Sequence, residues 1–136
     1  MRLTDSYLRL SGPATTPWSQ VLQRNGLANV RASYPLRPYA PQVRALEPLR
    51  LMRIRSSMRH AAMNQQIFHL WWHPHNFGAH TEENLSVLRQ VLEDFDCLRR
   101  GEGMVSIGMA EAADAVRSGA SIDERNAMRA NNFGLS

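Results

Sequence analysis

The hydrophobic pattern of the chain centres on an apolar run that ends abruptly against histidines and a proline. The run is Phe68-His69-Leu70-Trp71-Trp72-His73-Pro74-His75-Asn76-Phe77-Gly78. It is too short for a helix and is bounded by breaker residues, which predicts a buried strand over residues 67–72 that opens into a loop. In α/β proteins, binding and catalytic residues gather at the carboxyl ends of such strands.

Alternation along this strand predicts two faces. One face carries Phe68, Leu70 and Trp72, and the other carries Ile67, His69, Trp71 and His73. His73 is the last strand residue, so its ring should stand at the rim of the sheet. His69 lies roughly 13 Å earlier at about 3.3 Å per residue, so the two histidines should not share a metal ion. We expect His69 to pack in the core.

The loop after the strand offers a second histidine pair, His73 and His75, which flank a proline. Zinc normally takes three or four protein ligands, and this loop contains no Cys, Asp or Glu. We therefore expect His75 to be solvated, and we assign the chemistry of the loop to His73.

The clearest helical period follows the loop and predicts a helix over residues 81–101. Thr81 should cap it, acidic residues fill its first turn, and Gly101 closes it after two arginines. Its apolar stripe consists of Leu85, Leu88, Val91, Leu92, Phe95 and Leu98. Cys97, the only cysteine of the chain, is expected to be a small buried residue on this helix rather than a nucleophile.

Shorter elements surround this central pair. Downstream, the pattern predicts a strand over 104–106 and a helix over 109–117, with Ala112, Ala113 and Val116 facing inward. Upstream, it predicts a short helix over 17–24, a weak strand over 28–33 and a proline-rich loop over 34–41. A helical turn over 42–46, a strand over 49–55 and a helix over 57–65 capped by Ser56 are expected to follow. Alternating strands and helices indicate an α/β protein with a parallel sheet or barrel.

The length of the chain limits this architecture. Its 136 residues correspond to one ordinary domain and fall short of the roughly 250 residues of a full α/β barrel. We expect residues 1–27 to form a connector or insert, residues 28–117 to form the α/β part, and the polar residues 118–136 to fray. The chain has no apolar stretch long enough to span a membrane and no signal-peptide pattern, so a cytoplasmic location is expected.

The charge of the chain is uneven. Its formal net charge is +4, and every basic residue is an arginine. Between residues 24 and 59, Glu47 is the single acid among Arg24, Arg31, Arg37, Arg44, Arg50, Arg53, Arg55 and Arg59. Such a stretch could meet phosphates or an anionic sugar. A nucleic-acid partner is nevertheless not expected, because no nucleic-acid motif is present and the arginines alternate with prolines rather than with stacking aromatics. A solvated or interdomain surface is the simpler interpretation.

Several segments resemble one known family. The central run is similar to the C-terminal end of a polysaccharide deacetylase, of the NodB-homology family (carbohydrate esterase family 4), in the branch found with bacterial surface-polysaccharide genes. The likeness extends, over most of residues 28–115, to Arg31-Ala32-Ser33, Leu36-Arg37-Pro38-Tyr39, Leu51-Met52-Arg53-Ile54, Glu83-Asn84-Leu85, Met104-Val105-Ser106 and Met109-Ala110-Glu111-Ala112-Ala113.

The resemblance implies a fold and a reaction. The fold would be the C-terminal part of an irregular (β/α) barrel, and the reaction would be removal of N-acetyl groups from amino sugars of a polysaccharide, with a divalent, zinc-like metal. In the family, a histidine at the end of a late strand protonates the leaving amine. Leu70-Trp71-Trp72-His73 matches that motif, so the resemblance assigns this role to His73. Leu70, Trp72, His75 and Asn76 are the expected substrate-binding residues.

The remaining family motifs are missing. No stretch like Thr-Phe-Asp-Asp-Gly occurs, and the histidines that are four residues apart, His69 and His73, lie on a strand. The metal ligands and the catalytic base therefore have no counterparts in this chain. We expect either a deacetylase fragment whose partner is the missing N-terminal part of the barrel, or a non-catalytic remnant that binds sugar or a partner protein.

Overall fold

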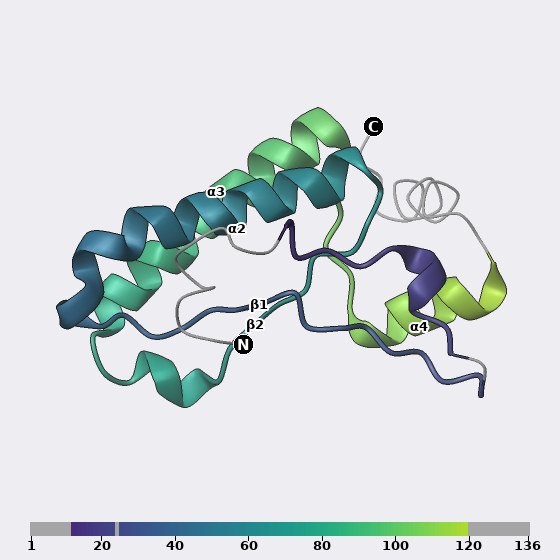
Figure 1. Cartoon of the computed structure of the whole chain (residues 1–136), viewed down its shortest axis with the longest axis horizontal. Helices are drawn as coiled ribbons and strands as arrows, with labels where there is room; N and C mark the ends of the chain where they lie inside the picture. The colour runs from purple at the N-terminus through teal and green to yellow at the C-terminus, as the bar shows by residue number, and fades with distance from the viewer. Residues whose placement is uncertain (1–11, 24, 120–136) are drawn as a thin grey trace, which may run out of the picture.

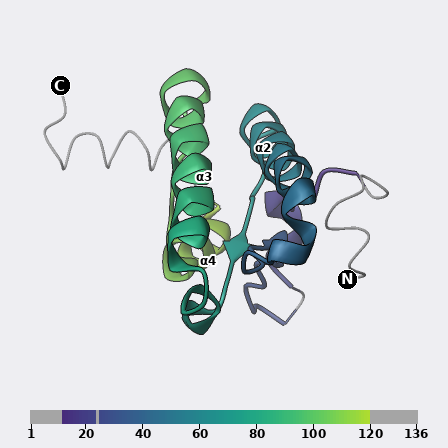
Figure 2. The ribbon, with the colours of Figure 1, turned by 90° about the vertical axis from the view of Figure 1, so that its left-hand side faces the viewer.

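The computed structural model describes residues 12–23 and 25–119 of the chain (Figure 1). Their elements, with η marking 3₁₀ helices, are η1 (Trp18–Gln20), β1 (Tyr34–Pro35), η2 (Pro41–Leu46), α2 (Glu47–Met63), β2 (Leu70–Trp71), η3 (Pro74–Phe77), α3 (Thr81–Glu102) and α4 (Met109–Ser118). The long helices α2 and α3 lie side by side in both views, and the two strands run next to them (Figures 1 and 2).

The two strands form a parallel pair, and the chain between them makes one crossover connection. Tyr34 lies opposite Leu70, and Pro35 lies opposite Trp71. The Leu36 N–H donates to the Trp71 carbonyl at 2.8 Å and extends the ladder beyond β1. Because parallel neighbours need a long connection, η2 and α2 serve as the crossover helix of a βαβ unit. The described part is thus helix-rich with a two-stranded parallel sheet. Its relation to a barrel stays a prediction.

The central strand is shorter than residues 67–72. β2 covers Leu70–Trp71 only. Ile67 forms instead an isolated antiparallel bridge with Thr16, through two backbone hydrogen bonds of 2.9 Å. The N-terminal segment therefore pairs with the beginning of the run, before the run turns to meet β1.

Helix α2 corrects two predictions. Residues 49–55 are not a strand, and the helix does not begin at residue 57, because residues 47–63 form one continuous helix. Pro48 lies in its first turn, where a missing N–H breaks no hydrogen bond, and Ser56 lies inside the helix. The buried positions follow a helical period: Glu47, Arg50, Leu51, Arg53, Ile54, Ser57, Met58 and Ala61.

Helix α3 confirms the prediction over residues 81–101, with changes at its start and on its inner face. The residue before the helix is His80, in the left-handed conformation with φ 54°, so Thr81 is the first helical residue and not the cap. The Thr81 hydroxyl donates to the Phe77 carbonyl at 2.8 Å. The buried residues are Asn84, Val87 and Val91, whereas Leu85 and Leu92 are 42% and 56% exposed.

The core lies where α2, α3 and the strands meet. Its buried members are Tyr34, Leu36, Leu51, Ile54, Met58, Val87 and Val91. Partly buried residues pack against them, among them Phe68, Leu70, Leu88, Phe95, Leu98 and Met104. Cys97 is exposed, which corrects its predicted burial, because it lies on α3 away from this contact.

The remaining predictions have mixed outcomes. The helix over 109–117 is confirmed as α4. Ala112 is buried as predicted, whereas Ala115 is buried in place of Ala113 and Val116, which are half-buried. The turn over 42–46 is confirmed within η2, but the helix over 17–24 shrinks to η1. Residues 28–33 and 104–106 form no strand, and β1 lies instead inside the predicted proline-rich loop. Ser118 is helical, and the rest of the tail lies outside the described residues except for Gly119.

Among the residues described, no helix combines the length and the apolar character that crossing a membrane requires.

Two glycines at the end of α3 provide a paired test of this geometry. Gly103 ends the helix with φ 68°, whereas Gly101 is helical and an added Cβ there would meet open space. Gly103→Ala should lower the free energy of unfolding by about 1 kcal/mol, because an L residue is strained at positive φ. Gly101→Ala should raise it by about 0.5–1 kcal/mol. Urea unfolding followed by circular dichroism measures both changes. If both variants shifted the free energy of unfolding in the same direction, the assignment of Gly103 as the end of the helix would be contradicted.

Candidate functional site

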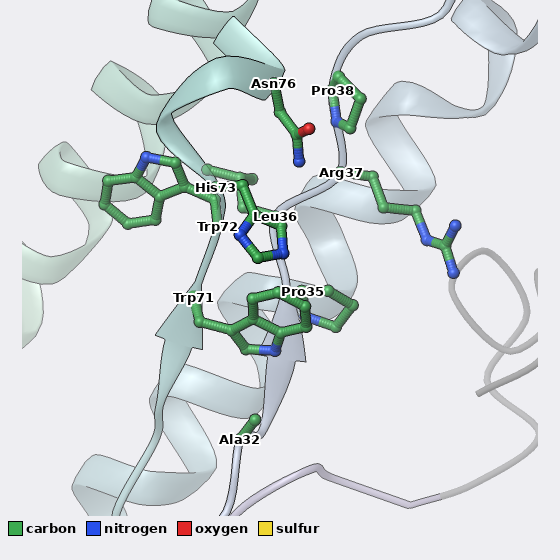
Figure 3. A pocket seen from close by; sticks show the side chains of 9 residues that line it. All are labelled: Ala32, Pro35, Leu36, Arg37, Pro38, Trp71, Trp72, His73 and Asn76. Atoms are coloured by element: carbon green, nitrogen blue, oxygen red, sulfur yellow. The ribbon is translucent and has the colours of Figure 1, made fainter.

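A pocket of about 450 Å³ opens at the carboxyl ends of the two parallel strands (Figure 3). The β1 side and its following loop contribute Ala32, Pro35, Leu36, Arg37 and Pro38. The β2 side and its following loop contribute Trp71, Trp72, His73 and Asn76. This is the edge of a parallel sheet at which ligands generally bind in α/β proteins.

The side chains after β2 alternate as the strand pattern predicts. Trp71 and His73 lie on one side of the chain, with ring centroids 5.3 Å apart in an edge-to-face contact. Trp72 extends to the other side (Figure 3), where its ring lies 6.0 Å from that of Phe77. The His73 ring is also stacked on the His75 ring at 5.2 Å. Trp71, His73 and His75 therefore form a short aromatic column along one side of the strand end.

The structure brings together some of the predicted site residues. His73, Trp72 and Asn76 line the pocket, and His73 is exposed at its rim. Leu70 does not line the pocket, because it packs against the core instead. His75 is exposed, as expected, and reaches the site only by stacking on His73.

The other pocket residues were not assigned to the site from the sequence: Ala32, Pro35, Leu36, Arg37, Pro38 and Trp71. Trp71 could have been found, since alternation places it on the same face as His73. Arg37 lies in the predicted proline-rich loop, but the position of that loop beside the strand end depends on the pairing of β1 with β2.

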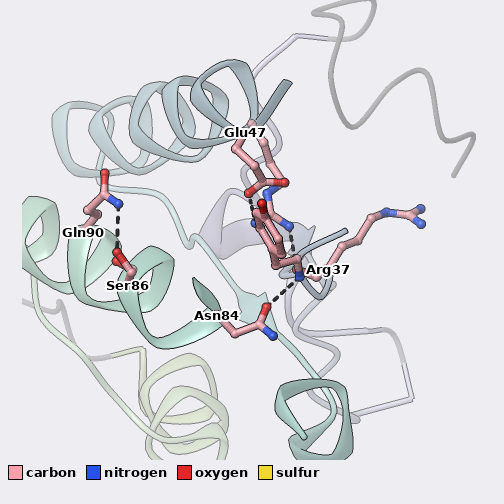
Figure 4. A network of polar contacts seen from close by, with 7 residues as sticks. Arg37, Glu47, Asn84, Ser86 and Gln90 are labelled. Atoms are coloured by element: carbon pink, nitrogen blue, oxygen red, sulfur yellow. Dashed lines mark hydrogen bonds and ion pairs between the residues drawn. The ribbon is translucent and has the colours of Figure 1, made fainter. Parts of the chain in front are cut away.

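Arg50 joins α2 to the loop after β1, which forms one wall of the pocket. Figure 4 shows the polar network around its partners Glu47 and Arg37. The Arg50 side chain is fully buried, donates to the Arg37 carbonyl and forms an ion pair with Glu47. Burial raises the pKa of the Glu47 carboxyl, and the guanidinium of Arg50 opposes that rise. The interpretation of the Arg-rich stretch as a solvated surface is wrong for Arg50 and Arg53, which are buried. It holds for the exposed Arg31, Arg44, Arg55 and Arg59. Arg53, which is 7% exposed, lies over the Tyr34 ring at 5.9 Å.

Asn84 fixes the same wall from α3 (Figure 4). It is 2% exposed, and its Oδ1 accepts a hydrogen bond from the Tyr39 N–H at 2.7 Å. Its Nδ2 donates to the Ala79 carbonyl at 2.8 Å. One side chain therefore joins the loop after β1, which lines the pocket, to the loop that follows η3.

His69 lies before the pocket and is partly buried. Its backbone N–H donates to Ser33 Oγ at 3.0 Å, and its carbonyl accepts from the Ser33 and Tyr34 N–H groups. Its Nδ1 is buried and has no hydrogen-bond partner among the residues the structure describes. His69 thus contributes to the packing of β1 against the run rather than to the pocket.

Metal binding has no visible basis in the described part of the chain. In residues 12–23 and 25–119, no three His, Cys, Asp or Glu side chains come together as a potential metal site. The stacked rings of His73 and His75 have no carboxylate beside them in the pocket wall. The described residues therefore supply no ligand set for the metal that the family resemblance implies.

Comparison of the chain with protein-family models, with curated proteins and with solved structures found no match.

Proposed function

We propose that this chain is the C-terminal part of a polysaccharide deacetylase of the (β/α)-barrel type, and that its pocket receives an N-acetylated amino sugar. The observation that carries the proposal is the position of His73. It lies just beyond the carboxyl end of β2, exposed at the rim of a pocket, with the Trp71 ring beside it. This is the place that the resemblance assigns to the general acid.

The chemistry suits the residue. Hydrolysis of an N-acetyl group releases an amine, which leaves more readily when a positioned acid protonates it. An imidazole titrates close to neutral pH and can supply that proton. The proposal assigns to this chain the acid and one wall of the sugar site. The metal ligands and the base belong to the remainder of the barrel.

A second candidate function is sugar binding without catalysis. It is favoured by the exposed indoles of Trp71 and Trp72, which are 37% and 40% exposed at the pocket. Exposed aromatic rings offer apolar surface to a ligand that also carries polar groups. Both candidates place an amino sugar in the same pocket, and they differ in whether His73 transfers a proton.

Binding of N-acetylglucosamine tetramers (chitotetraose) by the chain should depend on Trp71 much more than on His73. Trp71→Ala removes an exposed indole from the wall and should weaken binding about tenfold, which corresponds to loss of part of one aromatic contact. His73→Ala should change the affinity less, because an acid that acts in the transition state adds little to ground-state binding. Isothermal titration calorimetry measures both variants.

Trp18→Ala is the matched control, since Trp18 lies in η1 and outside the pocket wall. It should leave the affinity for chitotetraose unchanged. Equal losses in Trp18→Ala and Trp71→Ala would contradict the assignment of the pocket.

The family assignment has a test of its own, the reading frame upstream of Met1 in the source DNA. A frame that continues into a segment with the paired aspartates and the histidine pair of the family would support the enzyme. A stop codon just before Met1, with no such segment nearby, would favour the non-catalytic binder.

A further inference from the structure

The charged groups at the pocket are of one sign. The described residues that line it include Arg37 and the titratable His73, but no Asp or Glu. Glu47 reaches toward the same wall, but its carboxylate is already paired with Arg50. A negatively charged ligand would therefore meet a cation and no opposing carboxylate on the walls of this pocket.

The guanidinium of Arg37 has an unused donor. Its Nε is buried and finds no hydrogen-bond partner in the part of the chain that the structure describes. Other arginines, such as Arg50, Arg55 and Arg99, form ion pairs with acidic side chains. No acidic side chain of the described residues forms an ion pair with Arg37, so no neighbouring carboxylate neutralises its charge.

The backbone at Arg37 is held in place before any ligand binds. Its carbonyl accepts a hydrogen bond from Arg50, and the next N–H along the loop, that of Tyr39, donates to Asn84. The side chain then extends outward from the rim and away from the His73 ring (Figure 3). Arg37 and His73 could therefore contact two different sugar units of one bound oligosaccharide.

We propose that the pocket binds an acidic glycan. One N-acetylated amino sugar lies beside Trp71 and His73, and the carboxylate of a neighbouring sugar pairs with Arg37. This inference rests on the proposed function and adds the substrate class, a polysaccharide with uronic acid residues. The planar guanidinium matches a carboxylate through two parallel hydrogen bonds. A nucleic acid is less suited, because a phosphate backbone is tracked by several cations and this wall offers one arginine.

The test compares four probes by isothermal titration calorimetry at low ionic strength. A hyaluronan tetrasaccharide carries both N-acetyl groups and carboxylates, chitotetraose carries only N-acetyl groups, a galacturonate tetramer carries only carboxylates, and a dT oligonucleotide carries phosphates. Hyaluronan should bind about tenfold more tightly than chitotetraose, the gain of one charge-assisted contact. Arg37→Gln should abolish this advantage. Arg44→Gln, at an exposed arginine of η2 outside the pocket wall, should keep it.

The outcomes separate this inference from the proposed function. Equal affinity for hyaluronan and chitotetraose, or an advantage that survives Arg37→Gln, overturns the acidic-glycan inference and leaves amino-sugar binding standing. Equal binding of hyaluronan and the galacturonate tetramer, with none of chitotetraose, supports recognition of the carboxylate and overturns the amino-sugar function. Tighter binding of the oligonucleotide than of any glycan, or binding of none of the four probes, overturns the inference.

Discussion

Replacing Arg50 by alanine should lower the free energy of unfolding by about 3–5 kcal/mol, the range for breaking a buried ion pair by removing one partner. The Arg50 side chain is fully buried, so the change leaves the Glu47 carboxylate without its cation and the Arg37 carbonyl without its donor. Because small domains are stable by only about 5–15 kcal/mol, this change should remove a large share of the stability. Urea unfolding followed by circular dichroism at 25 °C measures the loss.

The exposed pair of Arg55 and Asp94 provides the matched control. It joins α2 to α3, and its side chains are 49% and 27% exposed. Arg55→Ala should therefore cost less than about 1 kcal/mol. The double change Glu47→Gln with Arg50→Met, which removes both charges, should recover part of the Arg50→Ala loss. Equal losses in Arg50→Ala and Arg55→Ala would show that the buried pair does not hold the pocket wall.

Replacing Asn84 by alanine should lower the free energy of unfolding by about 2–3 kcal/mol, because it leaves two backbone groups without partners. These groups are the Tyr39 N–H, in the loop after β1 that lines the pocket, and the Ala79 carbonyl, in the loop after η3. The loss of stability should be accompanied by weaker binding of chitotetraose, since the loops would no longer be fixed to one another. Unfolding in urea and titration calorimetry measure the two effects.

Two further variants test whether the hydrogen bonds of Asn84 cause this loss of stability. Asn84→Asp keeps the acceptor for Tyr39 but places a buried carboxylate oxygen against the Ala79 carbonyl, so at neutral pH it should lower stability at least as much as Asn84→Ala. Gln90→Ala removes an exposed hydrogen bond on the same helix and should change stability by less than about 0.5 kcal/mol. An Asn84→Ala protein that is as stable as Gln90→Ala would contradict the role of Asn84.

Sequence periodicity predicted the helices whose polar and apolar positions separate clearly. α3 and α4 are such helices, and each was placed within a residue or two of its bounds. α2 was misread because Arg50 and Arg53 occupy inner positions of the helix, which hides its apolar face and leaves an apparent alternation of residues 49–55. Burial of these arginines depends on Glu47, on the Arg37 carbonyl and on the Tyr34 ring, and a local pattern contains none of these contacts.

The pocket residues that belong to the strand end and its following loop were predicted from the sequence. The end of the apolar run located His73, Trp72 and Asn76 at the pocket. The opposite wall was not assigned, because Pro35 and Arg37 reach it through pairing across the βαβ unit, and that pairing is a tertiary contact. Leu70 was assigned to substrate although it faces the core, since the match to a family motif took precedence over the alternation of the strand.

The most direct test of the account is a titration of the ¹⁵N-labelled chain with chitotetraose, followed by NMR. The account predicts that the Trp71 indole N–H and the backbone amides of Leu36 and Asn76 shift together and saturate at one ligand per chain. The Trp18 indole and the amides of α4 should stay in place. Shifts spread evenly over the chain, or a Trp71 indole signal that does not move at saturating sugar, would contradict binding of an amino sugar at the carboxyl ends of β1 and β2.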